Sequence, residues 1–284
     1  MKKLFLKSLF AAACCLVFPA GMFAQFSGSG SGTKDDPYRI FNADQLNQVR
    51  NFVGKTVYFS LEADIDMTQW IAENNPSQGW LPIGGGSTSS FSGIFNGNGH
   101  TISNLWINRP NTDYIGLFGY ISTGADIQNL KLENAEYVGN DYVGGIVGYC
   151  YNANSITSCE FNGKISGNDY IGGIIGYIDN NGDHDFEVSD CNSYCHINGR
   201  DYIGGICGYN YNRVHGGENY RVFISDCLSY SNIDGRDYIG GICGYAYSYS
   251  DRTYSNSNIT ISNCYSYNHI NGNSNIGGVS GDNF

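Results

Sequence analysis

The sequence has little proline and little charge, and both are features that disordered chains use heavily. Its 284 residues include 5 prolines, and charged residues make up 14% of the chain. Aromatic residues also reach 14%, with 23 tyrosines, and there are 39 glycines. This composition is too apolar and too aromatic for a disordered tail. It favours a β-rich fold with many tight turns.

Signatures of common hydrolytic enzymes are also absent. The histidines do not form the HExxH pattern of a zinc protease, and there is no GxSxG or Walker motif. The sequence therefore gives no positive support for metal hydrolysis, acyl transfer or nucleotide hydrolysis, and we predict a non-catalytic protein. A polysaccharide-active β-helix enzyme is the alternative. It would need a cluster of carboxylates or a base on one groove, for which the candidates are Asp183, His184, Asp185, Glu187, His215 and Glu218.

The N-terminus has the pattern of a secretory signal peptide covering residues 1–24. Three lysines precede an apolar run from Leu9 to Phe18, Pro19 ends the run, and cleavage is expected after Ala24. The run is shorter than the ~20 apolar residues of a membrane span. Lipid anchoring at Cys14 is a less favoured alternative, because residues 15–23 stay apolar. Residues 25–32, with the sequence SGSGSG at 27–32, predict a flexible linker.

Export would leave an acidic protein. Without the three lysines of the signal, 12 basic and 26 acidic residues remain, a net charge of about −14. Such a surface repels nucleic acid and anionic lipid, which excludes both as partners. Neutral glycans, basic protein patches or divalent cations fit it better. We expect the mature chain to act outside the cell or on its surface, without a membrane span.

An internal repeat dominates residues 113–284. A glycine-rich block recurs, as in DYVGGIVGY at 141–149 and DYIGGICGY at 201–209, with starts at positions 113, 141, 169, 201, 237 and 274. A second block carries a cysteine at 159, 191, 227 and 264, and each of these lies ten residues before the next glycine block. Repetition of this kind indicates a stacked array rather than a globule with a unique core.

Variation in length is confined to one part of the repeat. From the last tyrosine of the glycine block to the cysteine, the separation grows through 10, 14, 18 and 19 residues. Insertions confined to one edge of a solenoid often mark its binding face. The lengthened segments are residues 178–187, 210–223 and 246–260, and they contain the candidate binding residues Tyr211, Tyr220, Tyr247, Tyr249, Tyr254, Asp183 and Asp185.

The pattern within each repeat predicts an all-β fold. Apolar residues alternate in short runs without helical periodicity, and Gly-Asn, Gly-Arg and Asn-Gly pairs separate them as turns require. A parallel β-solenoid, similar to a right-handed β-helix, satisfies these features. Residues 33–112 are expected to form an N-terminal cap and the first coils, with a helix at 42–53 and a strand at 55–67.

The glycine blocks also resemble a known motif. GLFG at 116–119 and the later GGIVG, GGIIG and GGICG are similar to the GLUG motif, which occurs in repeat regions of bacterial surface proteins. These include IgA-specific metalloproteases and filamentous-haemagglutinin-like adhesins. The opening GTKDDPYRIFNADQL resembles extracellular proteins of Bacteroidetes. The resemblance covers nearly all of the mature chain and implies a β-solenoid passenger or adhesion region.

Three columns of like residues follow from stacking the repeats. The aspartate column is Asp113, Asp141, Asp169, Asp201 and Asp237. Its carboxylates would repel one another at ~5 Å, so either bound Ca²⁺ or turn-capping hydrogen bonds must relieve them. We favour capping, helped by Arg200 and Arg236. The cysteines are expected to stack as buried thiols rather than to pair. Two tyrosine columns, one beginning at Tyr114 and one at Tyr120, predict ring stacking.

These features support three hypotheses for function. The first is a secreted or surface-exposed solenoid that binds an extracellular glycan or host protein through its lengthened loops, as an adhesin does. The second is a structural stalk without a ligand of its own. The third is the polysaccharide-active enzyme. No cofactor is expected, apart from the Ca²⁺ alternative at the aspartate column.

Overall fold

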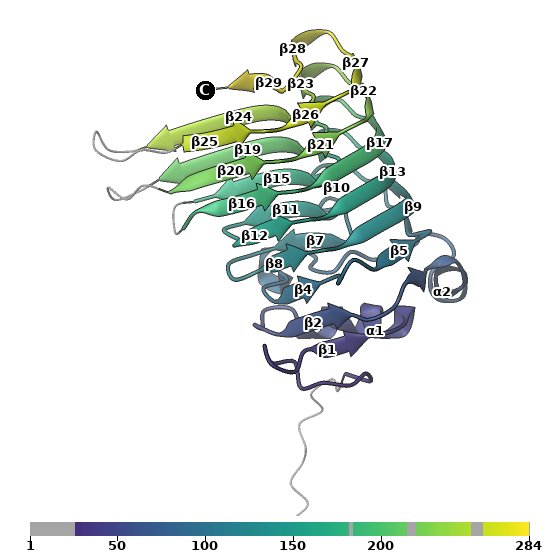
Figure 1. The fold of residues 1–284 in the computed structure, drawn as a ribbon. Helices are drawn as coiled ribbons and strands as arrows, with labels where there is room; N and C mark the ends of the chain where they lie inside the picture. The colour runs from purple at the N-terminus through teal and green to yellow at the C-terminus, as the bar shows by residue number, and fades with distance from the viewer. Residues whose placement is uncertain (1–25, 182–183, 215–219, 251–257, 284) are drawn as a thin grey trace, which may run out of the picture.

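A computed structural model describes residues 26–181, 184–214, 220–250 and 258–283, and it has the predicted parallel β-solenoid fold (Figure 1). Strands that are neighbours in space come from successive coils and pair in parallel, as in β11 with β15 and β15 with β19. Each coil therefore gains most of its backbone hydrogen bonds from the coils above and below it.

Four sheets run along the solenoid, named here A to D. Sheet A contains β1 (Tyr38–Ile40), β2 (Tyr58–Leu61), β4 (Ile94–Asn96), β8 (Asp126–Gln128), β12 (Ser155–Thr157), β16 (Phe186–Ser189), β20 (Arg221–Ser225) and β25 (Asn258–Ser262). Sheet B contains β3 (Ile65–Asp66), β5 (Thr101–Ser103), β6 (Trp106–Asn108), β9 (Lys131–Val138), β13 (Glu160–Ser166), β17 (Asn192–Asn198), β21 (Leu228–Ser229), β22 (Asn232–Asp234), β26 (Tyr265–Ser266) and β27 (His269–Asn271).

Sheets C and D complete the coil. Sheet C contains β7 (Phe118–Ile121), β11 (Val147–Tyr151), β15 (Ile175–Asn180), β19 (Cys207–Val214), β24 (Cys243–Ser250) and β29 (Ser280–Asn283). Sheet D contains β10 (Val143–Gly144), β14 (Asp169–Gly172), β18 (Asp201–Gly204), β23 (Asp237–Gly240) and β28 (Ser274–Gly277). Each repeat passes through D, C, A and B in turn, so the segments of variable length all lie between sheets C and A.

The glycine block forms the corner between sheets D and C. A Cβ atom on Gly173 would lie 2.2 Å from the carbonyl oxygen of Gly205 in the next coil and 2.0 Å from Ser193 Oγ across the interior. Any side chain at this position would clash with backbone, so only glycine allows the coils to approach so closely. This explains why the glycine pair recurs from Gly144-Gly145 onward, whereas the first block has Gly116 followed by Leu117.

The interior is filled by columns of identical or similar apolar side chains. Val143, Ile171, Ile203 and Ile239 occupy one register position in sheet D, and all four are fully buried. Burying an isoleucine side chain contributes roughly 1.5–3 kcal/mol, so each added coil brings its own increment of stability.

The cysteines stack in the interior as predicted. All eight cysteines within the described part of the chain are free thiols, and seven are buried. Cys191 lies at the corner between sheets A and B, where its Sγ donates to the carbonyl oxygen of Ser189 at 3.3 Å. Burial raises the pKa of Cys195 to about 11, which keeps that thiol protonated and unreactive at neutral pH.

The N-terminal cap differs in part from the prediction. The expected helix at 42–53 is present as α1 (Ala43–Gln48) followed by the 3₁₀ helix η1 (Val49–Phe52), and Asn42 caps it by accepting from the Gln45 N–H. The expected strand at 55–67 is divided into β2 and β3. Two further elements, α2 (Thr68–Asn74) and the 3₁₀ helix η2 (Ser87–Ser89), were not predicted.

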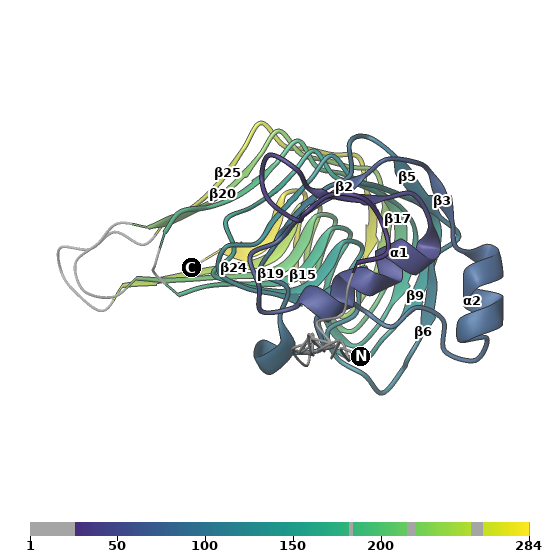
Figure 2. The same cartoon turned by 90° about the horizontal axis from the view of Figure 1, so that it is seen from below.

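Residues 26–32, predicted as a flexible linker, pack against the cap instead. Phe26 is buried and contacts the rings of Tyr38, Phe52 and Phe59. The carbonyl oxygen of Ser29 accepts a hydrogen bond from Arg39 N–H at 2.9 Å. This segment and α1 lie across the N-terminal end of the coils in Figure 2 and cover apolar surface there. The repeated serines and glycines conceal this role, because the single phenylalanine provides the packing.

Five tyrosines of the glycine block have an unusual backbone conformation. Tyr114, Tyr142, Tyr170, Tyr202 and Tyr238 have φ angles between 57° and 62°. The left-handed region costs a residue with a side chain roughly 1–2 kcal/mol. Their rings stack from coil to coil, as in the pair Tyr142 and Tyr170 with centroids 4.9 Å apart. Each stacked pair contributes roughly 0.5–1.5 kcal/mol, which offsets the backbone strain. In the sixth repeat, Asn275 occupies the equivalent position with a φ of 52°.

Two substitutions at Tyr170 separate ring stacking from backbone strain. Asparagine tolerates the left-handed region, so Tyr170→Asn loses the ring contacts only and should lower the free energy of unfolding by about 1–2 kcal/mol. Tyr170→Val adds a β-branched side chain in the same conformation and should lose roughly 1–2 kcal/mol more. Urea unfolding followed by circular dichroism measures both values. Equal stability of the two variants would contradict the strain argument.

Candidate functional site

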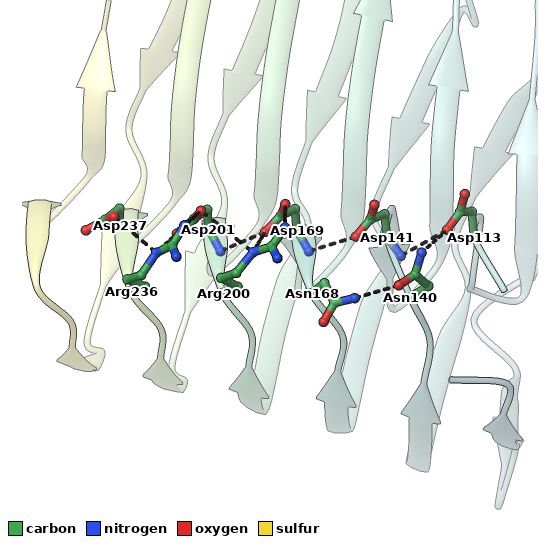
Figure 3. Close-up of polar contacts among 9 residues, drawn as sticks. All are labelled: Asp113, Asn140, Asp141, Asn168, Asp169, Arg200, Asp201, Arg236 and Asp237. Atoms are coloured by element: carbon green, nitrogen blue, oxygen red, sulfur yellow. Dashed lines mark hydrogen bonds and ion pairs between the residues drawn. The ribbon is translucent and has the colours of Figure 1, made fainter. Parts of the chain in front are cut away.

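The aspartate column is a hydrogen-bonded ladder between coils (Figure 3). Asp113 Oδ1 accepts the backbone N–H of Asp141 at 3.3 Å, and Asp141 Oδ1 accepts that of Asp169 at 3.2 Å. Asp169 Oδ1 accepts that of Asp201 at 3.2 Å. The aspartates therefore cap backbone groups, as the favoured alternative predicted. They cap the next coil rather than their own turn.

Residues that precede the aspartates form a parallel column of partners. Arg200 Nε donates to Asp169 Oδ1 at 2.8 Å, and Arg236 Nε donates to Asp201 Oδ1 at 2.9 Å, each with a second contact through Nη2. Arg236 also lies 3.2 Å from Asp237 Oδ2. The arginines thus relieve the repulsion between stacked carboxylates.

Asp141 is the exception in this ladder. Asn168 holds the position equivalent to Arg200, and its amide donates to Asn140 Oδ1 at 2.5 Å rather than to Asp141 (Figure 3). Burial raises the pKa of Asp141, and the neighbouring carboxylates of Asp169 and Asp113 add to the effect. No group of three or more metal-ligating side chains is found in the described ranges. Capping by Asp113, Asp141 and Asp169 is observed directly in these hydrogen bonds, and Ca²⁺ at Asp141, Asp169, Asp201 and Asp237 stays a prediction.

One projecting edge, called the wing below, is formed by the described parts of the lengthened segments, which are residues 178–181, 184–187, 210–214, 220–223, 246–250 and 258–260. It has two layers, one from β15, β19 and β24 of sheet C and one from β16, β20 and β25 of sheet A. The strands β20, β24 and β25 extend away from the body of the solenoid in Figure 2. The wing therefore lies between sheets C and A, where the insertions were predicted to lie on one edge.

Most of the described candidate residues lie on or beside strands rather than in irregular loops. Tyr211 is in β19, and Tyr247 and Tyr249 are in β24. Tyr220 precedes β20, and Asp185 precedes β16 and accepts the Arg221 N–H at 2.8 Å. Asp183 and Tyr254 lie outside the described residues. The strand assignment was missed because the polar, tyrosine-rich sequence was interpreted as loop, although its alternation has a period of two.

One face of the wing continues the tyrosine columns of the body. In register, Tyr209 pairs with Tyr245, Tyr211 with Tyr247, and Arg213 with Tyr249. The rings of Tyr211 and Tyr247 stack at 5.6 Å, and the Arg213 guanidinium lies 5.8 Å from the Tyr249 ring centroid. This face therefore presents aromatic rings and a cation beyond the body of the solenoid.

Buried asparagines hold the two layers of the wing together. Asn180 donates to the carbonyl oxygen of His184 at 3.2 Å and to Asn212 Oδ1 at 3.0 Å. Asn212 in turn donates to the carbonyl oxygens of Tyr220 and Asn258, at 3.0 and 3.1 Å. Both amides are buried. These bonds satisfy backbone groups where the layers diverge, so the tyrosine face rests on an ordered base.

The candidate catalytic residues are engaged in separate contacts. His184 Nε2 lies 2.9 Å from the carbonyl oxygen of Ala153. Glu187 Oε1 accepts from Ser189 Oγ at 2.7 Å, and Asp185 accepts the Arg221 N–H. His215 and Glu218 lie outside the described residues. The described members of this group each support the local backbone or a neighbouring side chain.

Comparisons with known proteins support a repeat protein and its fold. No family model matches the chain. A candidate Gly-rich membrane protein of Evansella cellulosilytica is 41% identical over 123 residues, which cover 43% of this chain and 14% of that protein. Halomucin of Haloquadratum walsbyi is 36% identical over 120 residues, which cover 42% of this chain and 1% of that protein. The chain thus spans a small part of both relatives.

A solved structure shares the architecture. It is a candidate immunoglobulin A1 protease from Bacteroides ovatus, which superposes with a TM-score of 0.51 over 83% of this chain and 76% of its own, at 21% sequence identity. This likeness concerns the fold alone. Neither α1, α2 nor any other helix in the described ranges has the length and hydropathy of a membrane-spanning helix.

Replacing Asn168 by arginine should complete the ladder. Asn168→Arg places a guanidinium beside Asp141 as Arg200 lies beside Asp169, and should raise the free energy of unfolding by about 0.5 kcal/mol at low salt. Asn273→Arg is the matched control, because Asp237 there already has Arg236 and Ser274 as partners. Thermal melts at low and high salt measure the effect. An equal gain in stability in both variants would show that the added positive charge stabilises the acidic protein in general and not through Asp141.

The raised pKa of Asp141 gives a pH-dependent prediction. Because its folded pKa lies above the unfolded value, the ionised carboxylate destabilises the fold once the pH has risen through the folded pKa. Asp141→Asn should therefore be at least as stable as the native protein at pH 7, and the difference should disappear below about pH 4. Asp169→Asn, which loses the Arg200 partner, should be destabilised at pH 7. Urea unfolding between pH 3 and 8 checks both.

Proposed function

We propose that this chain is a non-catalytic, surface-exposed or secreted β-solenoid that binds an extracellular glycan or host protein through its wing. The observation that carries the proposal is the tyrosine face of the wing, with Tyr211, Tyr247, Tyr249 and Arg213 on adjacent strands. Tyrosine and arginine are enriched where proteins recognise partners, because each combines a large contact area with polar groups. Tyr249 is 42% exposed, which leaves its ring accessible to a partner.

The order within the wing also supports binding. Stacked rings lose little conformational freedom when they contact a ligand, since the strands already hold them. The net negative charge of the chain disfavours nucleic acid and anionic lipid. Relatives named as a membrane protein and as Halomucin agree with a location at the cell surface, and we propose export through the N-terminal signal.

Binding should depend on the wing tyrosines and not on the fold of the solenoid. The purified protein is expected to bind saturably to at least one of immobilised mucin, a glycan panel or matrix proteins. Tyr211→Ser with Tyr247→Ser should weaken that binding roughly tenfold, because hot-spot aromatic residues contribute most of the energy. Biolayer interferometry gives the affinities, and circular dichroism checks folding.

Tyr265→Ser is the matched control. Tyr265 lies on sheet B and is 61% exposed, so its loss removes an accessible ring away from the wing. Equal affinity of the native protein and the wing variant would overturn the assignment of the site. Absence of binding to every surface would favour the structural stalk.

A further inference from the structure

A groove lies on sheet B, on a different part of the coil from the wing. In one coil, β17 runs without interruption from Asn192 to Asn198. In the next two coils the equivalent strand is divided, into β21 and β22 and then into β26 and β27. The groove follows these breaks and has a volume of about 500 Å³. This volume is in the usual range for small-ligand sites.

Two exposed tyrosines stand at the breaks. Tyr230 is 64% exposed and Tyr267 is 62% exposed, whereas the tyrosines of the stacked columns are more covered. Their ring centroids are 6.5 Å apart and the rings are tilted by 40°. In the stacked columns the rings are nearly parallel, as in Tyr177 and Tyr209 at 4.9 Å and 2°. The faces of Tyr230 and Tyr267 are therefore not covered by each other.

The floor of the groove is polar and well ordered. Asn268 Oδ1 accepts from Ser231 N–H at 2.7 Å and from Ser229 Oγ at 2.9 Å, and its amide donates to the carbonyl oxygen of Gly241 at 2.6 Å. Ser231 Oγ lies 3.3 Å from Cys195 Sγ. These contacts fix the backbone at the breaks, so the tyrosines above project from a rigid base.

Polar side chains along the groove have capacity to bind a ligand. Asn232 and His269 are neighbours in register, and neither side chain makes a hydrogen bond to another described residue. His196 lies one coil earlier at the same position and is 3.9 Å from Asp234. Among the residues that the structure describes, no carboxylate, lysine or arginine lines the groove. The lining therefore offers amide and imidazole groups without a fixed charge.

We propose that this groove binds a neutral glycan chain that crosses successive coils. Sugar rings have apolar C–H faces that stack on aromatic rings and hydroxyl groups that bond amide and imidazole groups, which matches the exposed tyrosines beside Asn232 and His269. Four coils line the groove, and three of them carry Tyr194, Tyr230 and Tyr267 at one position, which offers a row of contacts to an extended polymer.

The charge of the residues that line the groove favours a neutral glycan over an acidic one. An acidic polysaccharide needs arginine or lysine near its carboxylates, and the lining has neither. Its approach would also be opposed by the net charge of the whole protein. The proposal is independent of the wing, because the two surfaces lie on different sheets and share no residue.

Affinity electrophoresis in gels that contain one polysaccharide each tests the groove. The purified protein is compared in galactomannan, xyloglucan, mixed-linkage β-glucan and starch, with alginate and hyaluronan as acidic arms. Retardation is expected in at least one neutral gel, and Tyr230→Ala with Tyr267→Ala should weaken it roughly tenfold or more. Both rings are exposed, so the variant should fold normally, which circular dichroism checks.

Two further variants make the outcome specific. Tyr265→Ala removes a ring of similar exposure on the same sheet that does not line the groove, and should leave retardation unchanged. Tyr211→Ser with Tyr247→Ser alters only the wing and should also leave it unchanged. Retardation only in the acidic gels, no retardation in any gel, or retardation that survives loss of Tyr230 and Tyr267 would overturn the proposal. Loss of retardation in the wing variant alone would support glycan binding at the wing and reject binding in the groove.

Discussion

The parallel, in-register hydrogen bonding between coils is the constraint on which the rest of the structure depends. Register places each residue opposite its equivalent in the neighbouring coil, as Ile171 is opposite Ile203. A residue type that recurs in the repeat therefore meets itself. This is favourable for isoleucine, which fills the core, and for tyrosine, which stacks. It is unfavourable for aspartate, whose carboxylates then need hydrogen-bond donors or arginines between coils.

The same constraint explains why a strained conformation is repeated. The left-handed tyrosines lie at the start of the sheet D strands, as Tyr170 does in β14, two residues before the glycines that allow close approach of the backbone. Ring stacking offsets the backbone strain along the whole column, because each internal ring has a partner above and below. The strain is thus tolerated because the neighbouring coils have the same geometry. At the end of the column, Asn275 takes the place of tyrosine. Asparagine adopts the left-handed region more readily than tyrosine, so this position does not need ring stacking to offset the backbone strain.

Features set by the repeat were predictable from the sequence, and features set by single residues were not. The block spacing predicted the solenoid, the tyrosine columns and the edge that carries the insertions, because register converts spacing directly into position. The role of Phe26 was hidden by the serines and glycines around it, and α2 has no repeat to mark it. The wing strands were taken for loops because polar composition was given more weight than the alternation of Tyr209, Tyr211 and Arg213.

The groove was missed for a related reason. The sequences around Tyr194, Tyr230 and Tyr267 are nearly equivalent, so nothing in the pattern indicated that β17 is continuous while the next two strands are divided. The division depends on which small polar side chain lies beneath the sheet, and Ser231 and Asn268 bond backbone groups that a continuous strand would pair. The spacing of the repeats alone does not tell whether a backbone group bonds a side chain or the neighbouring strand.

Where the surface of the solenoid is regular, its side chains already have partners in the neighbouring coils. In the stacked columns, each tyrosine face is covered by the ring of the next coil, and each paired aspartate has its donors. Ligand-binding capacity is therefore expected where register holds the backbone but the side chains no longer match. The wing meets this condition because Arg213 and Tyr249 differ at one register position. The groove meets it because the strand divides and the rings of Tyr230 and Tyr267 tilt apart.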